Sequence, residues 1–108
     1  MPGYVCLVSR VHVIELHELS ATQAETFMSD IQKVSKSLAV VAASVKLNYE
    51  IHGNTLPHLH MHFFPRYRGD PFEGRAIEPR RVTQPVYAPG QYSAMRDRLI
   101  SAINEGAA

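Results

Sequence analysis

Residues 57–65 read Pro57-His58-Leu59-His60-Met61-His62-Phe63-Phe64-Pro65, and this stretch determines how the rest of the chain is interpreted. Successive side chains of a β-strand point to opposite faces of a sheet, so alternate residues share a face. The stretch therefore predicts a strand over residues 58–64 that carries three imidazoles on one face: His58, His60 and His62. The other face is apolar and should pack on a core; it holds Leu59, Met61 and Phe63.

The neighbouring segments supply the rest of a sheet. Residues 45–51 alternate with period two, and the sequence His-Gly-Asn-Thr at 52–55 is typical of a tight turn, so this strand and the histidine strand should form a hairpin. A further apolar run rich in β-formers, residues 4–8, predicts another strand. We expect four or five antiparallel strands in total, including a short one at residues 82–87.

Helical patterns occupy two other segments. Ser20 is followed three residues later by Gln23, a capping-box pattern that starts a helix. Apolar residues then recur at spacings of three and four, which predicts an amphipathic helix over residues 22–42. A shorter helical face near the C-terminus carries Tyr92, Met95, Leu99 and Ile103. The fold class is therefore α+β, with residues 66–91 forming a long loop rich in proline and arginine.

Composition limits the class of protein. The chain has 108 residues, which fits one domain over residues 1–108, and a formal net charge of +1, which argues against a nucleic-acid-coating protein. Cys6 is the single cysteine and cannot form an internal disulfide, so we expect a reducing, cytoplasmic location. The longest aliphatic run, residues 38–43, is far shorter than the roughly 20 residues that cross a bilayer, so no membrane association is expected.

The row of histidines allows four interpretations: a solvated polar face, a metal site, general acid–base catalysis, and nucleophilic catalysis at phosphorus. Polar strand faces normally use Thr, Ser, Lys and Glu rather than three histidines in register. His58 and His62 lie roughly 13 Å apart along a strand, too far to share one ion, although two neighbouring histidines with a ligand from elsewhere remain possible. An imidazole can attack phosphorus while its neighbours stabilise the developing charge, without any metal or cofactor.

Residues 58–64 resemble the His-x-His-x-His-x-x signature of the histidine triad superfamily of nucleotide hydrolases and transferases. The flanks resemble it too: Gly53-Asn54-Thr55 stands where the family has a Gly-Gln-Ser/Thr turn, and the segment from Pro2-Gly3-Tyr4 to His12 resembles its Pro-Gly-His start and following strand. The block from Asn48 to Arg66 is most similar to bacterial members related to diadenosine-polyphosphate hydrolases.

The resemblance implies roles for individual residues. His60 matches the nucleophile that becomes nucleotidylated, His62 the histidine at the phosphate and leaving group, and His58 the supporting member. The implied substrate-binding residues are Asn48, Asn54, Thr55 and His12, with His12 behind the triad. His17 and His52 match no family position and should lie on the surface. The family usually carries a further segment before Pro-Gly-His that builds much of the base and ribose pocket; here only Met1 precedes Pro2-Gly3, so we expect that segment to be absent.

Five arginines follow the triad within sixteen positions, and guanidinium groups bind phosphates in a bidentate manner. Arg66, directly after the histidine strand, is the expected phosphate ligand. Arg75, Arg80 and Arg81 fit solvated loop charges slightly better, because acidic residues lie among them. The segment does not show aromatic and basic residues interleaved on one basic face, so the signal for a specific nucleic-acid partner is weak.

The sequence therefore predicts a histidine triad hydrolase that cleaves a nucleoside phosphoanhydride, such as a dinucleoside polyphosphate, through a nucleotidyl-His60 intermediate. The resemblance implies a homodimer, which the strongly apolar stretch 38–45 also favours. Three alternatives stay open: a phosphoramidate hydrolase, a nucleotide-binding module without turnover, and a zinc-binding protein.

Overall fold

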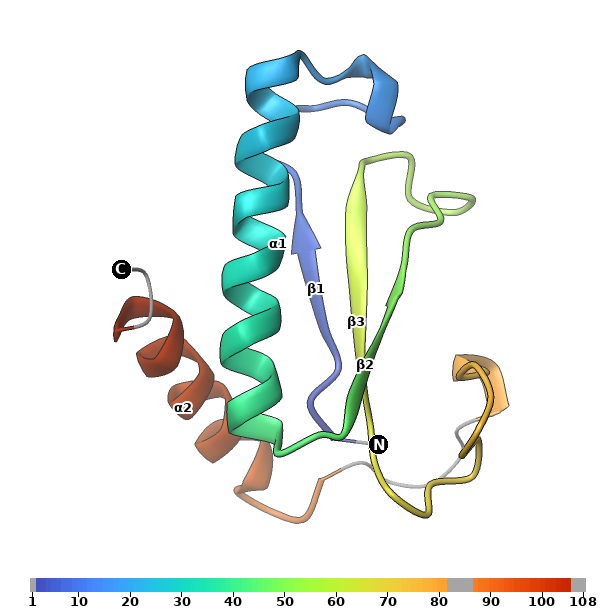
Figure 1. Ribbon diagram of the computed structural model, residues 1–108, viewed down its shortest axis with the longest axis vertical. Coiled ribbons are helices and arrows are strands. Elements are labelled where there is room, and N and C mark those ends of the chain that lie inside the picture. The colour runs from blue at the N-terminus through green and yellow to red at the C-terminus, as the bar shows by residue number, and fades with distance from the viewer. Residues whose placement is uncertain (1, 82–86, 106–108) are drawn as a thin grey trace.

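The computed structural model describes residues 2–81 and 87–105, and within them the elements form layers (Figure 1). A three-stranded antiparallel sheet has the order β1-β3-β2, with β1 at Val5–Val8, β2 at Lys46–Glu50 and β3 at His60–Arg66. The long helix α1, Ala21–Ala42, covers one face of the sheet. The segment after β3 runs along the other side. This arrangement confirms the predicted α+β class, with a central strand that carries the histidines.

The central strand differs from its prediction at both ends. It begins at His60 instead of residue 58, and it continues through Pro65 to Arg66. Pro65 is tolerated in a central strand because β1 pairs only as far as Phe63, so the missing N–H falls where β3 has lost that neighbour. On the other side β2 pairs along the whole end of β3, up to Lys46 opposite Arg66. The hairpin-like pairing of these two strands is as predicted.

Helix α1 begins where the sequence indicates. The Gln23 backbone N–H donates to Ser20 Oγ over 3.1 Å, and the Ser20 N–H donates to Gln23 Oε1 over 2.9 Å, which completes the capping box. The helix buries the apolar side of its predicted face, which holds Phe27, Ile31, Leu38 and Val41, and the first three belong to the core shared with the sheet. It ends at Ala42, and the C-cap residue Ala43 takes a left-handed conformation with φ of 53°.

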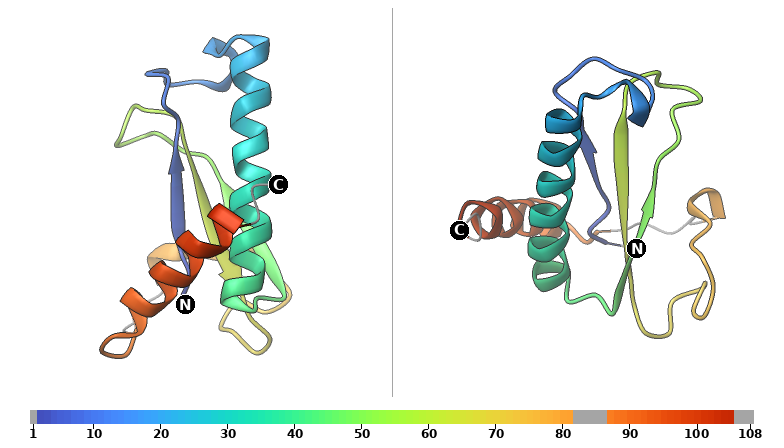
Figure 2. Two further views of the ribbon diagram at one scale, coloured as in Figure 1. Left: turned by 90° about the vertical axis from the view of Figure 1, so that its left-hand side faces the viewer. Right: turned by 45° about the horizontal axis from the view of Figure 1, so that its top comes forward.

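The second helix, α2 at Gln91–Glu105, lies against α1 on the side away from the sheet (Figure 2). Arg98 donates through Nη2 to the carbonyl oxygen of Val41 over 3.2 Å, which ties α2 to the end of α1. Among residues 2–81 and 87–105, no helix is both long and apolar enough to cross a membrane.

The strand count differs from the expected four or five. The described residues form three strands, and the short strand expected at 82–87 falls mainly on 82–86, outside the described residues. The same described ranges contain two short 3-10 helices, η1 at Leu16–Glu18 and η2 at Pro79–Arg81. Of the predicted loop over 66–91, Arg66 ends β3 and Gln91 begins α2, and the described residues between them are irregular apart from η2.

The N-terminal residues are fixed against the end of β3. Gly3 has φ of +90° and is buried, and a Cβ at this position would lie 2.9 Å from Cγ of Pro65. Its backbone N–H donates to the hydroxyl of Tyr87 over 2.7 Å, and the Tyr67 hydroxyl donates to the carbonyl of Pro2 over 2.7 Å. Only glycine fits both the space and the dihedral angle here, so β1 enters the sheet at a defined position.

Candidate active site

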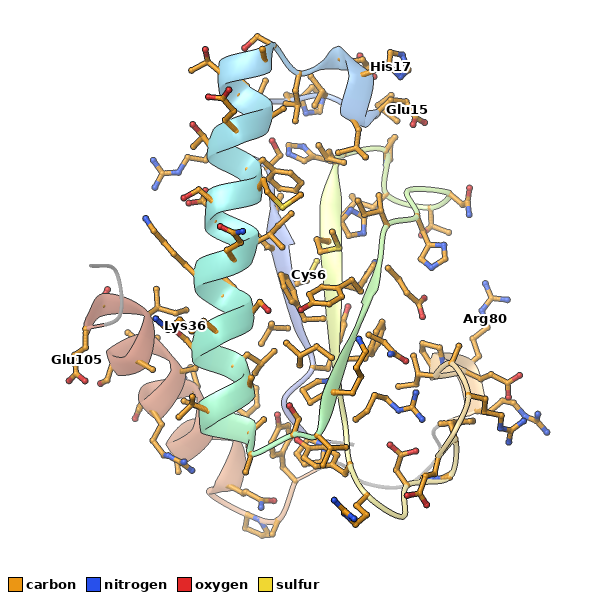
Figure 3. All side chains as sticks on the ribbon, in the orientation of Figure 1. Cys6, Glu15, His17, Lys36, Arg80 and Glu105 are labelled. Atoms are coloured by element: carbon orange, nitrogen blue, oxygen red, sulfur yellow. The ribbon has the colours of Figure 1, made fainter. Side chains whose placement is uncertain are left out.

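A cleft of about 860 Å³ covers the face of the sheet that α1 leaves open. Its floor carries His60 and His62 from β3, one wall is the turn after β2, which includes Asn54 and Thr55, and the opposite wall is the segment 77–81. Figure 3 shows Arg80 on η2, on the far side of the sheet from α1. The strand periodicity thus separates the two faces: Phe63 is fully buried beneath α1, while the neighbouring imidazoles face the cleft.

The His60 ring is held in one tautomer. Its Nδ1 lies 2.6 Å from the carbonyl oxygen of His58, and a carbonyl can only accept, so Nδ1 carries the proton. In the neutral ring Nε2 is then left with a free lone pair. His60 is 6% exposed and lines the cleft floor, which places a nitrogen lone pair of fixed orientation there.

His58 is oriented away from the cleft by two hydrogen bonds. Its Nε2 donates to the carbonyl of Ser9 over 2.6 Å, which leaves Nδ1 as an acceptor. The Nδ1 of His12 lies 3.0 Å from that nitrogen and therefore donates to it. Both ring nitrogens of His58 are occupied, so His58 and His12 brace the backbone that holds His60. The expectation that all three triad histidines line one surface is correct for His60 and His62 and wrong for His58.

His62 contacts the hydroxyl of Tyr4, with 2.6 Å between Tyr4 Oη and His62 Nδ1. The Tyr4 ring also stacks on Phe64, at 4.8 Å between centroids. Burial lowers the pKa of His62 below the usual histidine value, and the neighbouring His60 and His52 lower it further, against an opposing effect of Glu50. His62 is therefore neutral at pH 7 and can donate or accept a hydrogen bond in the cleft.

Arg66 is not placed in the cleft. Its side chain is 7% exposed, and it pairs with Asp70 through Nε and Nη2 over 2.9 and 3.0 Å. Its Nη1 donates to Oδ1 of Asn48 over 2.8 Å and to the carbonyl of Arg75 over 2.7 Å. The Asn48 Oδ1 also accepts from the backbone N–H of Ile77. The Arg66 guanidinium holds the pKa of Asp70 well below its usual range. Arg66 and Asn48 thus fasten the segment that forms the second cleft wall.

The structure adds cleft residues that sequence reasoning did not select. Arg80 and Arg81 line the cleft, although we expected solvated loop charges there. His52, expected on the surface, is exposed but also lines the cleft, and its Nε2 lies 2.8 Å from Glu50 Oε1. Loop positions follow no periodicity, so the arginine placement had no sequence signal. The position of His52 had a weak sequence signal, because His52 closely follows the strand that pairs with the histidine strand.

Cys6, which in the sequence indicates only the compartment, lies on the open face of the sheet. It pairs with His62 across the β1–β3 ladder and is exposed. Period-two alternation could have found it, since Tyr4 and Cys6 point the same way along β1. Burial raises the pKa of its thiol.

Comparisons with known proteins agree with this geometry. A histidine triad protein from Sinorhizobium meliloti is similar over 92% of this chain and 73% of that one, with a TM-score of 0.78 at 20% identity. A histidine triad protein from Marinobacter aquaeolei gives 0.77 at 27% identity, covering 94% and 74%. One from Bradyrhizobium japonicum gives 0.71 at 29% identity, covering 94% and 73%. No match was found among curated proteins.

The family model of the HIT domain matches residues 1–69, which is more than half of the chain. The matched region includes β1, α1, β2 and β3, and therefore both histidines of the cleft floor. On the strength of this match and of the fold it shares with solved histidine triad proteins, the chain belongs to the HIT domain family.

Proposed function

We propose that the protein hydrolyses a nucleoside phosphoanhydride of the dinucleoside polyphosphate type through a covalent nucleotidyl-His60 intermediate. The observation that carries the proposal is the 2.6 Å contact between His60 Nδ1 and the carbonyl of His58, because it leaves the Nε2 lone pair free at the cleft floor. HIT family membership supports nucleotide binding and hydrolase or transferase chemistry more generally.

The first step forms a bond between His60 Nε2 and the α-phosphorus, while the bond from phosphorus to the leaving phosphate oxygen breaks with its electron pair. His62, on the same strand face with 4.6 Å between ring centroids, is near enough to donate to the phosphoryl oxygens or the leaving group. In the second step, water forms the new P–O bond and releases one proton to solvent, the N–P bond breaks, and Nε2 recovers its lone pair.

The cleft walls fit a charged chain of phosphates. Arg80 and Arg81 stand on one wall and Asn54 and Thr55 on the other. Guanidinium groups suit the negative charge of a leaving polyphosphate, and the side chains of the turn offer hydrogen bonds to phosphate oxygens. Arg81 is partly neutralised by Glu78, with 3.0 Å between Nη1 and Oε2, so Arg80 carries more of the free positive charge.

The test is the rate of hydrolysis of diadenosine tetraphosphate by the wild type, His60→Ala and His17→Ala. His17 is exposed on η1 and serves as the matched control. Loss of the nucleophile should reduce kcat by at least about 10⁴-fold, whereas the control should stay within about twofold. A His60→Ala protein with the wild-type rate would contradict the mechanism. Faster cleavage of a nucleoside phosphoramidate would replace the substrate class, and mononucleotide binding without turnover would overturn the catalytic assignment.

We also propose that the protein is a homodimer. The apolar stretch at the end of α1 is covered only in part by its own chain: Leu38 is fully buried, whereas Val40 is 74% exposed and Val45 60% exposed. Sedimentation equilibrium should give about twice the chain mass of 12.1 kDa, and Val40→Asp should reduce it. A wild-type mass of one chain at micromolar concentration would contradict the proposal.

A further inference from the structure

The open face of the sheet brings a thiol next to the two cleft histidines. Cys6 on β1 is the ladder partner of His62 on β3, and His60 is two residues along the same strand. The Cys6 Sγ and one ring nitrogen from each histidine all lie within 4.8 Å of one another. Figure 3 shows Cys6 on β1, the edge strand that pairs with β3. These three side chains come from adjacent strands, so the backbone fixes their separation.

The existing hydrogen bonds leave a ligand atom free on each ring. His60 Nδ1 is committed to the carbonyl of His58, so its available nitrogen is Nε2. His62 contacts Tyr4 through Nδ1, so its available nitrogen is also Nε2. When Nε2 of His62 binds a cation, Nδ1 must carry the proton, and the Tyr4 hydroxyl oxygen can accept a hydrogen bond from this N–H group. Both rings thus already have the outer partners that metal-bound histidines normally use.

One thiolate and two imidazoles form a donor set for a borderline-soft ion. Mg²⁺ and Ca²⁺ prefer oxygen ligands, whereas Zn²⁺ takes sulfur and nitrogen in a tetrahedral arrangement. Tetrahedral Zn²⁺ bonds of about 2.0–2.3 Å place ligand atoms about 3.5 Å apart. The three atoms would therefore need to approach one another by about 1.3 Å at most, which small side-chain rotations can supply. A fourth position would face the cleft.

We propose that Cys6, His60 and His62 form a Zn²⁺ site on the open face of the sheet. We also propose that the bound ion inhibits hydrolysis, because it occupies Nε2 of His60. The binding half of this proposal is independent of the proposed function, while the inhibitory half rests on it. The two halves are therefore tested by different measurements.

The binding half is tested with Co²⁺, a spectroscopic substitute for Zn²⁺, on protein purified without a histidine tag. The wild type should take up one Co²⁺ per chain with a thiolate-to-cobalt charge-transfer absorption, and added Zn²⁺ should displace it. Cys6→Ser should lose that absorption and bind Zn²⁺ at least about tenfold more weakly by calorimetry, since removal of a ligand costs no less than removal of an outer partner. His17→Ala, which removes an exposed histidine elsewhere, should bind as the wild type does.

Cys6→Ala gives a second sulfur-free variant, and circular dichroism establishes that each variant is folded. Absence of a charge-transfer absorption in the wild type, or unchanged Zn²⁺ affinity in both folded cysteine variants, would overturn the proposal. The inhibitory half predicts that Zn²⁺ suppresses hydrolysis of diadenosine tetraphosphate by the wild type. It also predicts that Cys6→Ser retains the basal rate but requires at least about tenfold more Zn²⁺ for the same inhibition. Equal Zn²⁺ sensitivity of the two proteins would overturn that half alone, and a protein without turnover would still report on binding.

Discussion

The two faces of β3 serve different purposes, although they belong to the same seven residues. The face toward α1 is closed: Phe63 is fully buried, and its ring forms a T-shaped contact with Tyr49 at 5.6 Å between ring centroids. The open face keeps unused hydrogen-bonding capacity, most clearly at Nε2 of His60. Because side chains alternate along the strand, neighbouring residues of β3 contribute in turn to the stability of the core and to the chemistry of the cleft. Adjacent substitutions on this strand should therefore have effects of different kinds.

The largest effect on stability should come from the closed face. Phe63→Ala removes a side chain with no exposed surface and leaves a cavity under α1, at a cost of about 3–5 kcal/mol in the free energy of unfolding. The matched control is Phe64→Ala, on the open face, where the ring is half-buried and the loss should be clearly smaller. Urea denaturation measures both. Equal losses for Phe63→Ala and Phe64→Ala would break the distinction between the faces.

The far end of the open face is an exception, because Arg66 and Asp70 form a buried pair there with 7% and 3% exposed side chains. Asp70→Asn should cost about 3 kcal/mol at pH 7, the lower end of the range for a broken buried pair, because the amide keeps some hydrogen bonds. Asp97→Asn, in an exposed pair with Arg96, should change little and serves as the control.

The same pair predicts a pH dependence of stability. The folded-state pKa of Asp70 lies well below its ordinary 3.8, so the unfolded chain binds the proton more readily. The stabilisation is therefore complete above pH 4 or so and decreases as the pH falls below that value. Denaturation curves of the wild type should show this acid loss, and those of Asp70→Asn should lack that component. Parallel pH profiles for the two proteins would contradict the assignment.

The smallest effect should come from the hydroxyl that contacts His62. Tyr4→Phe keeps the ring stacked on Phe64 but removes the 2.6 Å contact, so kcat for hydrolysis should fall by about 2–12-fold, the equivalent of about 0.5–1.5 kcal/mol. The profile of kcat against pH should also change, because His62 loses a partner that constrains its protonation. Tyr92→Phe, an exposed tyrosine on α2, is the control and should leave both unchanged. An identical pH profile for Tyr4→Phe and the wild type would contradict a positioning role.

Patterns that repeat along the chain predicted the fold well. The capping box at Ser20 and the spacing of the apolar residues after it predicted α1 to within one residue of its start, and alternation predicted the pairing of β2 with β3. The same rules place His60 and His62 on one face. These sequence patterns are local, because the residues of each helix or strand carry the pattern that predicts it.

The remaining features depend on contacts between distant segments. Arg66 was expected to bind phosphate, but Asn48, eighteen residues earlier, and Asp70 occupy its guanidinium, and no periodic pattern announces such a network. Arg80 reaches the cleft because that network fastens the loop to the sheet. His58 does not line the cleft with His60 and His62, because its ring donates to the carbonyl of Ser9, beyond the end of β1. Sequence spacing alone does not show which polar group will find a buried partner.

The most direct test of the central claim is to trap the intermediate on His60. The wild type is mixed with a stoichiometric amount of diadenosine tetraphosphate, denatured within milliseconds at alkaline pH, where nitrogen–phosphorus bonds survive, and examined by intact-mass and peptide mass spectrometry. The account predicts one nucleotidyl group per chain, located on His60 within its peptide, and none in His60→Ala. Turnover without any adduct, or an adduct on His52 or His62 that persists in His60→Ala, would contradict it.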